Sequence, residues 1–141
     1  MQKQVGLWID HRKAVITTLI DGTETTREVF SNLDKRTRAS SGLRANPPDK
    51  KILALSEDVR DRHFERQLDA YYVQITSLIK DAGAIWIIGS GEAKVELEKF
   101  LKNHNLADRI AGVEPADKLT NRQIASKVRQ YFKVKKADIL P

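Results

Sequence analysis

The chain has 141 residues, of which 40% are hydrophobic and 31% are charged. This length suits one cored domain, and the composition excludes a disordered or collagen-like chain. No apolar run approaches the ~18 residues that a membrane span needs, and no apolar signal segment follows Met1. The absence of cysteine excludes disulfides and thiolate metal sites. We therefore expect a single domain over residues 1–141 that works in the cytoplasm, away from membranes.

The net charge of +6 is unevenly distributed along the chain. Residues 1–51 carry ten basic and six acidic side chains, residues 52–117 carry eight and twelve, and residues 118–141 carry seven and one. A nucleic-acid-binding protein often concentrates its cations on one face, so these basic ends matter most if folding brings them together. The charge makes an anionic partner the first one to consider.

Three strands are predicted near the amino terminus. Residues 5–9, 14–20 and 25–30 are rich in β-branched and aromatic side chains. The polar residues after Ile9 and the dipeptide Asp21-Gly22 supply tight turns between the strands. These runs predict an antiparallel meander.

Hydrophobic periodicity then disappears from residue 32 to residue 51, where Ser, Gly and Pro recur among cations. A loop of ~20 residues inside a compact domain is usually functional or disordered. We predict a long basic loop over residues 32–51.

The second half of the chain alternates helix and strand patterns. Residues 84–88 are uniformly apolar, as in a strand covered on both faces, and residues 109–113 form a short fifth strand. Gly83 stands where the first helix should end, a capping box at residues 120–123 opens the last helix, and residues 133–141 are predicted to be a frayed C-terminal tail. Apolar side chains recur at helical spacing in three segments: Phe64, Leu68, Tyr71, Tyr72, Ile75, Leu78 and Ile79; Ala93, Leu97, Phe100 and Leu101; Ile124, Val128, Tyr131 and Phe132.

The predicted order of elements is therefore βββαβαβα. Right-handed crossovers would place the fourth and fifth strands beside the first. This predicts an α/β fold of the ribonuclease-H-like type: a mixed five-stranded sheet in the order 3-2-1-4-5, with helices on both faces.

A two-metal nuclease is the sharpest enzymatic hypothesis for such a fold, because Asp10 follows the first strand. Two divalent ions need three or four converging carboxylates, and here only Glu114 stands at the end of another parallel strand. We favour the alternative that Asp10 begins a turn. The three histidines show no metal-ligand spacing, and we predict no metal site.

A glycine-containing segment, Gly89-Ser-Gly-Glu-Ala-Lys94, lies between a predicted strand and a predicted helix. Backbone amides at such a junction can receive a phosphate. The segment lacks the third glycine of a dinucleotide fingerprint and the Gly-Lys-Ser/Thr of a P-loop. We favour a tight turn in which Ser90 caps the helix, and we predict no cofactor.

Basic side chains gather in two segments. Those of the loop are Lys35, Arg36, Arg38, Arg44, Lys50 and Lys51, and those along and beyond the last helix are Lys127, Arg129, Lys133, Lys135 and Lys136. Cations on a flexible segment can follow a phosphate backbone and release its counterions. Solubility is the alternative explanation, since charged runs usually face solvent. We favour nucleic-acid contact for the loop and keep both explanations for the helix.

Four motifs, taken in their order and spacing, resemble a known family. They are Val5-Gly-Leu-Trp-Ile-Asp-His-Arg-Lys-Ala-Val15, Arg62-His-Phe-Glu-Arg66, Ile85-Trp-Ile-Ile-Gly-Ser-Gly91 and Ile110-Ala-Gly-Val113. Over about residues 5–132, the chain resembles the middle domain of the eukaryotic and archaeal peptide chain release factor subunit 1, shared with the ribosome-rescue protein Pelota. The resemblance implies a translation-component domain of ribonuclease-H-like topology.

In the release factors, the loop before the first helix carries a Gly-Gly-Gln tip that orients a water for peptidyl-tRNA hydrolysis. The corresponding residues 32–51 contain only Gly42 and no glutamine. The resemblance therefore does not carry the hydrolytic role over to this chain. It implies that the basic loop has affinity for ribosomal RNA or tRNA, as in Pelota.

Our leading hypothesis is a noncatalytic RNA- or ribosome-binding domain related to translation termination and rescue factors. A hydrolase acting on RNA or peptidyl-tRNA is one alternative, although Gly-Gly-Gln and a convincing carboxylate cluster are both missing from the sequence. A protein-interaction or oligomerisation module is the other.

Overall fold

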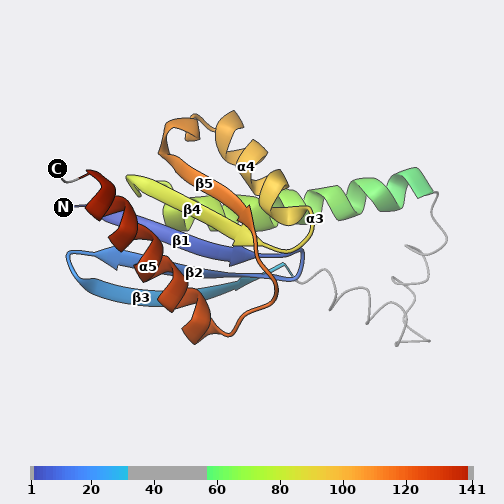
Figure 1. Ribbon diagram of the computed structural model, residues 1–141. Coiled ribbons are helices and arrows are strands. Elements are labelled where there is room, and N and C mark those ends of the chain that lie inside the picture. Colours follow the sequence, from blue (N-terminus) through green and yellow to red (C-terminus); the bar gives the residue numbers. More distant parts are fainter. Residues whose placement is uncertain (1, 32–56, 140–141) are drawn as a thin grey trace.

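The computed structural model describes residues 2–31 and 57–139, with side chains described over residues 2–31 and 64–133. The described part contains three α-helices, a short 3-10 helix at Ala107–Arg109 and one five-stranded sheet (Figure 1). The elements are, in chain order, β1 (Lys3–Ile9), β2 (Lys13–Ile20), β3 (Thr23–Phe30), α3 (Glu57–Ile79), β4 (Ala84–Gly89), α4 (Ala93–Asn103), β5 (Ile110–Pro115) and α5 (Asn121–Ile139).

The strands lie in the order β3-β2-β1-β4-β5, which confirms the predicted α/β topology. The meander β1-β2-β3 is antiparallel, while β1 pairs in parallel with β4, and β4 with β5. Ile9 lies opposite Gly89, and Gly89 opposite Pro115, so the three parallel strands finish together. We call this edge the carboxyl end of the sheet and the opposite edge the amino end.

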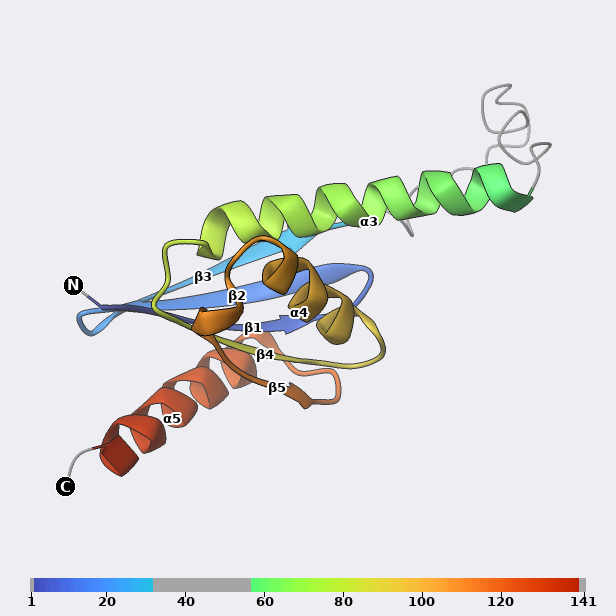
Figure 2. The same cartoon turned by 90° about the horizontal axis from the view of Figure 1, so that it is seen from above.

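Helices cover both faces of the sheet, as predicted. Figure 2 shows α3 and α4 on one side and α5 on the other. One apolar cluster joins the strands to α3 and α4 through residues such as Leu7, Ile75 and Leu97, and a second joins them to α5 through Trp8 and Val128. None of the described helices combines the length and apolar character needed to cross a membrane.

Burial differs strongly between central and edge strands. In β1 and β4, residues 5–9 and 85–89 are buried, because both faces of these strands carry a helix layer. In β3, Val29 is the single buried residue. The apolar run of residues 84–88 was therefore correctly interpreted as a strand covered on both faces.

Two glycines allow backbone and side chains to approach closely. A Cβ atom on Gly89 would clash with the carbonyl oxygen of Ile9 in the adjacent strand. A Cβ atom on Gly6 would clash with the methyl groups of Val128 on α5. Gly89 therefore permits the close approach of β1 and β4 at the carboxyl end, and Gly6 lets α5 lie close to the sheet.

Local signals at one turn and one helix start are confirmed. Asp21 and Gly22 join β2 to β3 with positive φ angles of 46° and 85°, a backbone conformation that favours this dipeptide. The capping box forms at α5: the Thr120 amide donates to Gln123 Oε1 at 2.9 Å, and the Gln123 amide donates to Thr120 Oγ1 at 3.1 Å.

Three features differ from the sequence prediction. The first helix ends at Ile79, and Gly83 instead donates its amide proton to the Lys3 carbonyl at 2.8 Å as β4 begins. Phe64, predicted on the buried face of that helix, is 45% exposed, because α3 extends beyond the sheet there (Figure 1). The last helix continues past Lys133 to Ile139, where the sequence predicted a tail.

Candidate functional site

The turn between β1 and β2, residues 10–13, lies at the carboxyl end of the sheet. Asp10 Oδ1 accepts hydrogen bonds from the amides of Arg12 at 2.8 Å and Lys13 at 2.9 Å. This is the local pattern that favours aspartate at the start of a turn. The structure therefore supports the interpretation of Asp10 as a turn residue.

The backbone of this turn is held by side chains from two other elements. The Tyr71 hydroxyl on α3 donates to the Asp10 carbonyl at 3.0 Å. The hydroxyl of Ser31, which follows β3, donates to the His11 carbonyl, and the Ser31 amide donates to the Arg12 carbonyl at 2.9 Å. The turn is thus tied to α3 and to Ser31, the residue that directly follows β3.

The His11 ring belongs to a polar network that joins the turn to both helices of this face. Glu96 Oε1 on α4 accepts a hydrogen bond from the Tyr72 hydroxyl at 2.6 Å and lies 3.0 Å from His11 Nε2. Because the carboxylate oxygen is an acceptor, Nε2 is assigned the proton. The His11 ring also meets Phe64 edge to face, with ring centroids 6.4 Å apart.

The two tyrosines of this region are held in their neutral, proton-donating form. Burial, together with the Asp10 charge and neighbouring Tyr72, raises the pKa of Tyr71 well above its ordinary value. Burial also raises the pKa of Tyr72, with further contributions from the hydrogen bond and charge of Glu96 and the charge of Asp69.

The glycine-containing segment after β4 is a tight turn, but Ser90 does not cap the following helix. The N-cap of α4 is Glu92, which makes no side-chain capping bond. Gly91 has a φ angle of 72°, which shifts the helix start two residues beyond Ser90. The Ser90 assignment was therefore wrong.

Glu114, the second acid considered for a metal site, has another partner. Its Oε2 atom accepts a hydrogen bond from the Trp86 indole at 2.6 Å, within the side of the sheet that α5 covers. Among the described residues, no group of three His, Asp or Glu side chains is placed to hold a metal ion.

The cations predicted on the last helix have different surroundings. Lys127 and Lys133 are exposed, and within the described residues neither has an ion-pair partner. Arg129 instead pairs with Glu24 of β3. Lys135 and Lys136 lie within the helical span of α5.

Arg129 also lines a shallow groove of about 510 Å³ between β3 and α5. Arg122 lines the same groove, together with Glu24 and Glu28 of β3. Because two acids of β3 and two arginines of α5 line it together, the groove does not extend the positive charge of α5.

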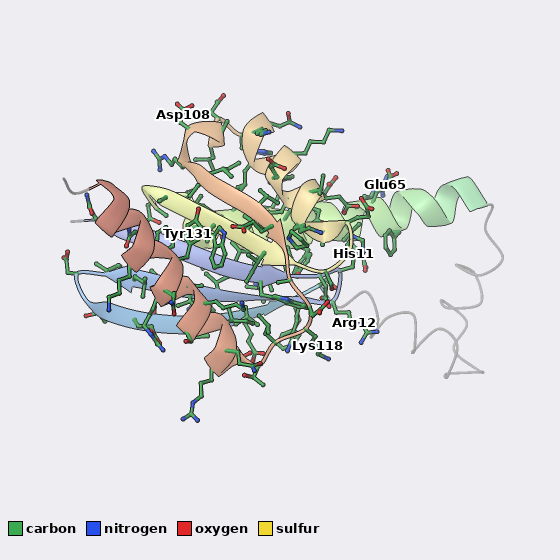
Figure 3. All side chains as sticks on the ribbon, in the orientation of Figure 1. His11, Arg12, Glu65, Asp108, Lys118 and Tyr131 are labelled. Carbon is green, nitrogen blue, oxygen red and sulfur yellow. The ribbon has the colours of Figure 1, made fainter. Side chains whose placement is uncertain are left out.

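The remaining predicted cations lie outside the described residues. They are Lys35, Arg36, Arg38, Arg44, Lys50 and Lys51. Ser31, where the described meander stops, lies at the carboxyl end of the sheet. The later turns of α5 lie toward the amino end, where the Tyr131 hydroxyl donates to the Ala111 carbonyl at 3.2 Å (Figure 3). Ser31 therefore lies at the opposite end of the sheet from the later turns of α5.

Sequence reasoning missed the His11, Glu96 and Tyr72 network and the exposure of Phe30 and Phe64. His11 and Glu96 lie 85 positions apart, so no local spacing relates them. The predicted proximity of the first strand end and the helix after the fourth strand is the one signal that could have suggested their contact.

Searches against known proteins identify the fold. The sequence matches no protein-family model and no curated protein. Among solved structures, the Pelota protein of Thermoplasma acidophilum matches 93% of this chain with a TM-score of 0.53 and 16% sequence identity. Pelota of Archaeoglobus fulgidus matches 98% of it, with a TM-score of 0.48 and 16% identity, and an archaeal translation termination factor matches 96%, with a TM-score of 0.48 and 12% identity.

The chain thus has the fold of a Pelota-like domain, which confirms the resemblance at the level of fold. It spans 31%, 38% and 41% of the length of those three proteins, respectively.

Proposed function

We propose that this chain is a noncatalytic RNA-binding domain related to translation termination and rescue factors, with ribosomal RNA or tRNA as its partner. The fold shared with Pelota supports a related role. The net charge of +6 supports an anionic partner. The absence of Gly-Gly-Gln from residues 32–51 supports a binding role over peptidyl-tRNA hydrolysis.

The observation that carries this proposal is the unbalanced positive charge on α5. Lys127 and Lys133 are exposed, and no carboxylate of the described residues pairs with either. Exposed, uncompensated lysines can replace the counterions that surround a phosphate backbone. Arg129 contributes less in this proposal, because its guanidinium pairs with Glu24.

Co-sedimentation with ribosomes tests the proposal. The reversals Lys127→Glu with Lys133→Glu, and separately Arg36→Glu with Arg38→Glu and Arg44→Glu, should each weaken co-sedimentation and flatten its dependence on salt. Lys99→Glu is the matched control, because Lys99 is an exposed lysine on α4, which covers the other face of the sheet.

Three outcomes are informative. Unchanged co-sedimentation of the three-arginine variant would overturn the assignment of residues 32–51. Unchanged behaviour of the two-lysine variant would overturn the role of α5. A partner of the tagged wild-type chain that survives RNase treatment would favour a protein-interaction module over RNA binding.

A further inference from the structure

The groove between β3 and α5 brings carboxylates and guanidinium groups together. Glu24, Thr26 and Glu28 alternate along β3, so their side chains share the face of the strand that meets α5. Arg122 and Arg129 line the other wall. Because β3 is an edge strand, the groove opens at the margin of the sheet, beside the first turns of α5 (Figure 1). A ligand can therefore enter it without separating the helix from the core.

The acids of the groove do not neutralise all of its cations. Glu24 pairs with Arg129, and Glu28 lies 3.6 Å from Lys13 of β2. Arg122 is exposed, and within the described residues no carboxylate pairs with it. A guanidinium can form two parallel hydrogen bonds with a carboxylate or a phosphate. The groove therefore favours an anionic ligand.

The cations of the groove continue along one flank of α5. Arg122, Arg129 and Lys133 are seven and four residues apart, which places them within about 40° of one another around the helix axis and over about 16 Å along it. Lys133 is exposed and has no ion-pair partner among the described residues. Lys127 lies on a different flank of the helix. A row of cations suits a chain of phosphates better than a single small anion.

The pair between Glu24 and Arg129 is open to exchange. The Arg129 side chain is 53% exposed and that of Glu24 is 31% exposed. Exposed ion pairs contribute little to stability, so the guanidinium can exchange one oxyanion for another at small cost. A phosphate chain already held by Lys133 or Arg122 presents its next phosphate to Arg129 at high local concentration.

We propose that the groove between β3 and α5 is a phosphate-binding site for RNA, in which Glu24 holds Arg129 until a backbone phosphate displaces it. This site rests on the proposed RNA-binding function and extends it from the lysines of α5 to the groove. The exchange frees a carboxylate for every phosphate bound at Arg129, so few counterions are released in total. Arg129 therefore adds little to the salt dependence while Glu24 is charged, and adds a full contact once that charge is removed.

Titration of the full chain with a labelled single-stranded oligouridine of about 12 nucleotides tests this site. Glu24→Gln should raise affinity roughly 2- to 5-fold, the range expected for removing an exposed ion pair that competes. It should also steepen the salt slope by roughly 0.7, because the phosphate then meets Arg129 without displacing a carboxylate. Urea denaturation should show that the variant stays folded.

Glu98→Gln is the matched control for the loss of one negative charge. Glu98 also belongs to an exposed ion pair, with Lys102 at 3.2 Å, but it lies on α4, which covers the other face of the sheet (Figure 2). Its effect on affinity should stay below about 2-fold, since distant charges are screened by salt.

Two further backgrounds connect the effect to Arg129. In an Arg129→Gln chain, the gain from Glu24→Gln should shrink to that of Glu98→Gln, because no guanidinium is left to release. In a Lys127→Gln chain the gain should persist in full, because Lys127 lies on another flank of α5. In the otherwise wild-type chain, Arg129→Gln should lower the salt slope less than Lys133→Gln does.

The outcomes distinguish the groove site from RNA binding itself. If the wild-type chain binds the oligouridine and Glu24→Gln gains no more than Glu98→Gln, or gains equally without Arg129, the groove site is wrong while RNA binding stands. An equal gain with poly-L-glutamate as the ligand would assign the groove to an acidic protein and overturn the phosphate site. If the wild-type chain binds neither ribosomes nor single-stranded RNA, both proposals are wrong.

Discussion

The β1–β2 turn and two lysines of helix α5 differ in whether their charges have ion-pair partners. At the turn, Asp10 accepts backbone amides, His11 pairs with Glu96 and Lys13 pairs with Glu28. On α5, Lys127 and Lys133 have no such partner among the described residues. These contacts hold the turn against its neighbouring elements and offset the charge of His11 and Lys13. Uncompensated lysines leave α5 suited to long-range attraction of phosphate.

The largest expected effect comes from disturbing the close approach of β1 and β4 beneath the turn. Gly89→Ala should lower the free energy of unfolding by about 3 kcal/mol, because the new methyl group would meet the Ile9 carbonyl oxygen. Urea denaturation measures this change.

Gly83→Ala is the matched control at the other end of β4. Its added Cβ atom would lie 3.8 Å from the Lys3 carbonyl oxygen, an ordinary contact. The control should alter the free energy of unfolding by less than about 1 kcal/mol. Equal effects of the two substitutions would show that the carboxyl end is not specially constrained.

The second-largest expected effect is a fall in the free energy of unfolding at alkaline pH, caused by the two tyrosines beside the turn. The pKa of Tyr71 and of Tyr72 is raised in the folded chain, so both phenols stay protonated when the unfolded chain ionises. Stability from these groups is complete below the unfolded pKa of about 10 and falls as pH rises through the folded values. Above the unfolded pKa, each tyrosine should lower the free energy of unfolding by roughly 1.4 kcal/mol per pH unit. Denaturation between about pH 9 and pH 11 measures it.

The substitutions Tyr71→Phe and Tyr72→Phe should each remove part of this slope. A slope that persists unchanged in the double variant would assign the alkaline transition to other groups.

Removing the Tyr72 hydroxyl, in the turn network, should lower the stability more than removing the Tyr131 hydroxyl on α5. Both losses should be smaller than the effects described above. Tyr72→Phe removes the hydrogen bond to the Glu96 carboxylate and should cost about 2 kcal/mol, because hydrogen bonds to charged groups are the stronger class. Tyr131→Phe removes a 3.2 Å bond to the Ala111 carbonyl and should cost about 0.5 kcal/mol. Thermal unfolding of both variants tests the difference. A larger loss for Tyr131→Phe would reverse the comparison.

Much of the fold follows from local patterns in the sequence. Residues 84–88 identified a central strand because β-sheet burial on both faces demands continuous apolar side chains. Thr120 and Gln123 identified the start of α5 because a capping box is satisfied within four residues. Strand order followed from the handedness of crossover connections.

Features that depend on contacts between residues far apart in the sequence could not be predicted from local patterns. Phe64 follows the helical period of α3, but periodicity indicates a face and not how far the neighbouring sheet extends. Ser90 has the propensity of a cap, yet the positive φ angle of Gly91 moved the helix start onward. The contact between His11 and Glu96 joins three elements, so it required the assembled fold.

The cations predicted on and after the last helix also show what local patterns reveal and what only the assembled fold reveals. Lys127, Arg129 and Lys133 were grouped by sequence, but the structure separates Arg129 because Glu24 of β3 reaches it. The sequence prediction placed Lys127 and Arg129 on the last helix and Lys133 at the start of a tail beyond it. Only the packing of β3 beside α5 revealed which charge is compensated.

The affinity of the full chain for single-stranded RNA, measured across a range of salt concentrations, tests RNA binding through α5 most directly. We expect the logarithm of affinity to fall linearly with the logarithm of salt, and Lys127→Gln and Lys133→Gln to reduce that slope by roughly 0.7 each. Lys99→Gln should leave it unchanged. An absence of RNA binding, or a slope that is the same in all three variants and the wild type, would contradict the proposal.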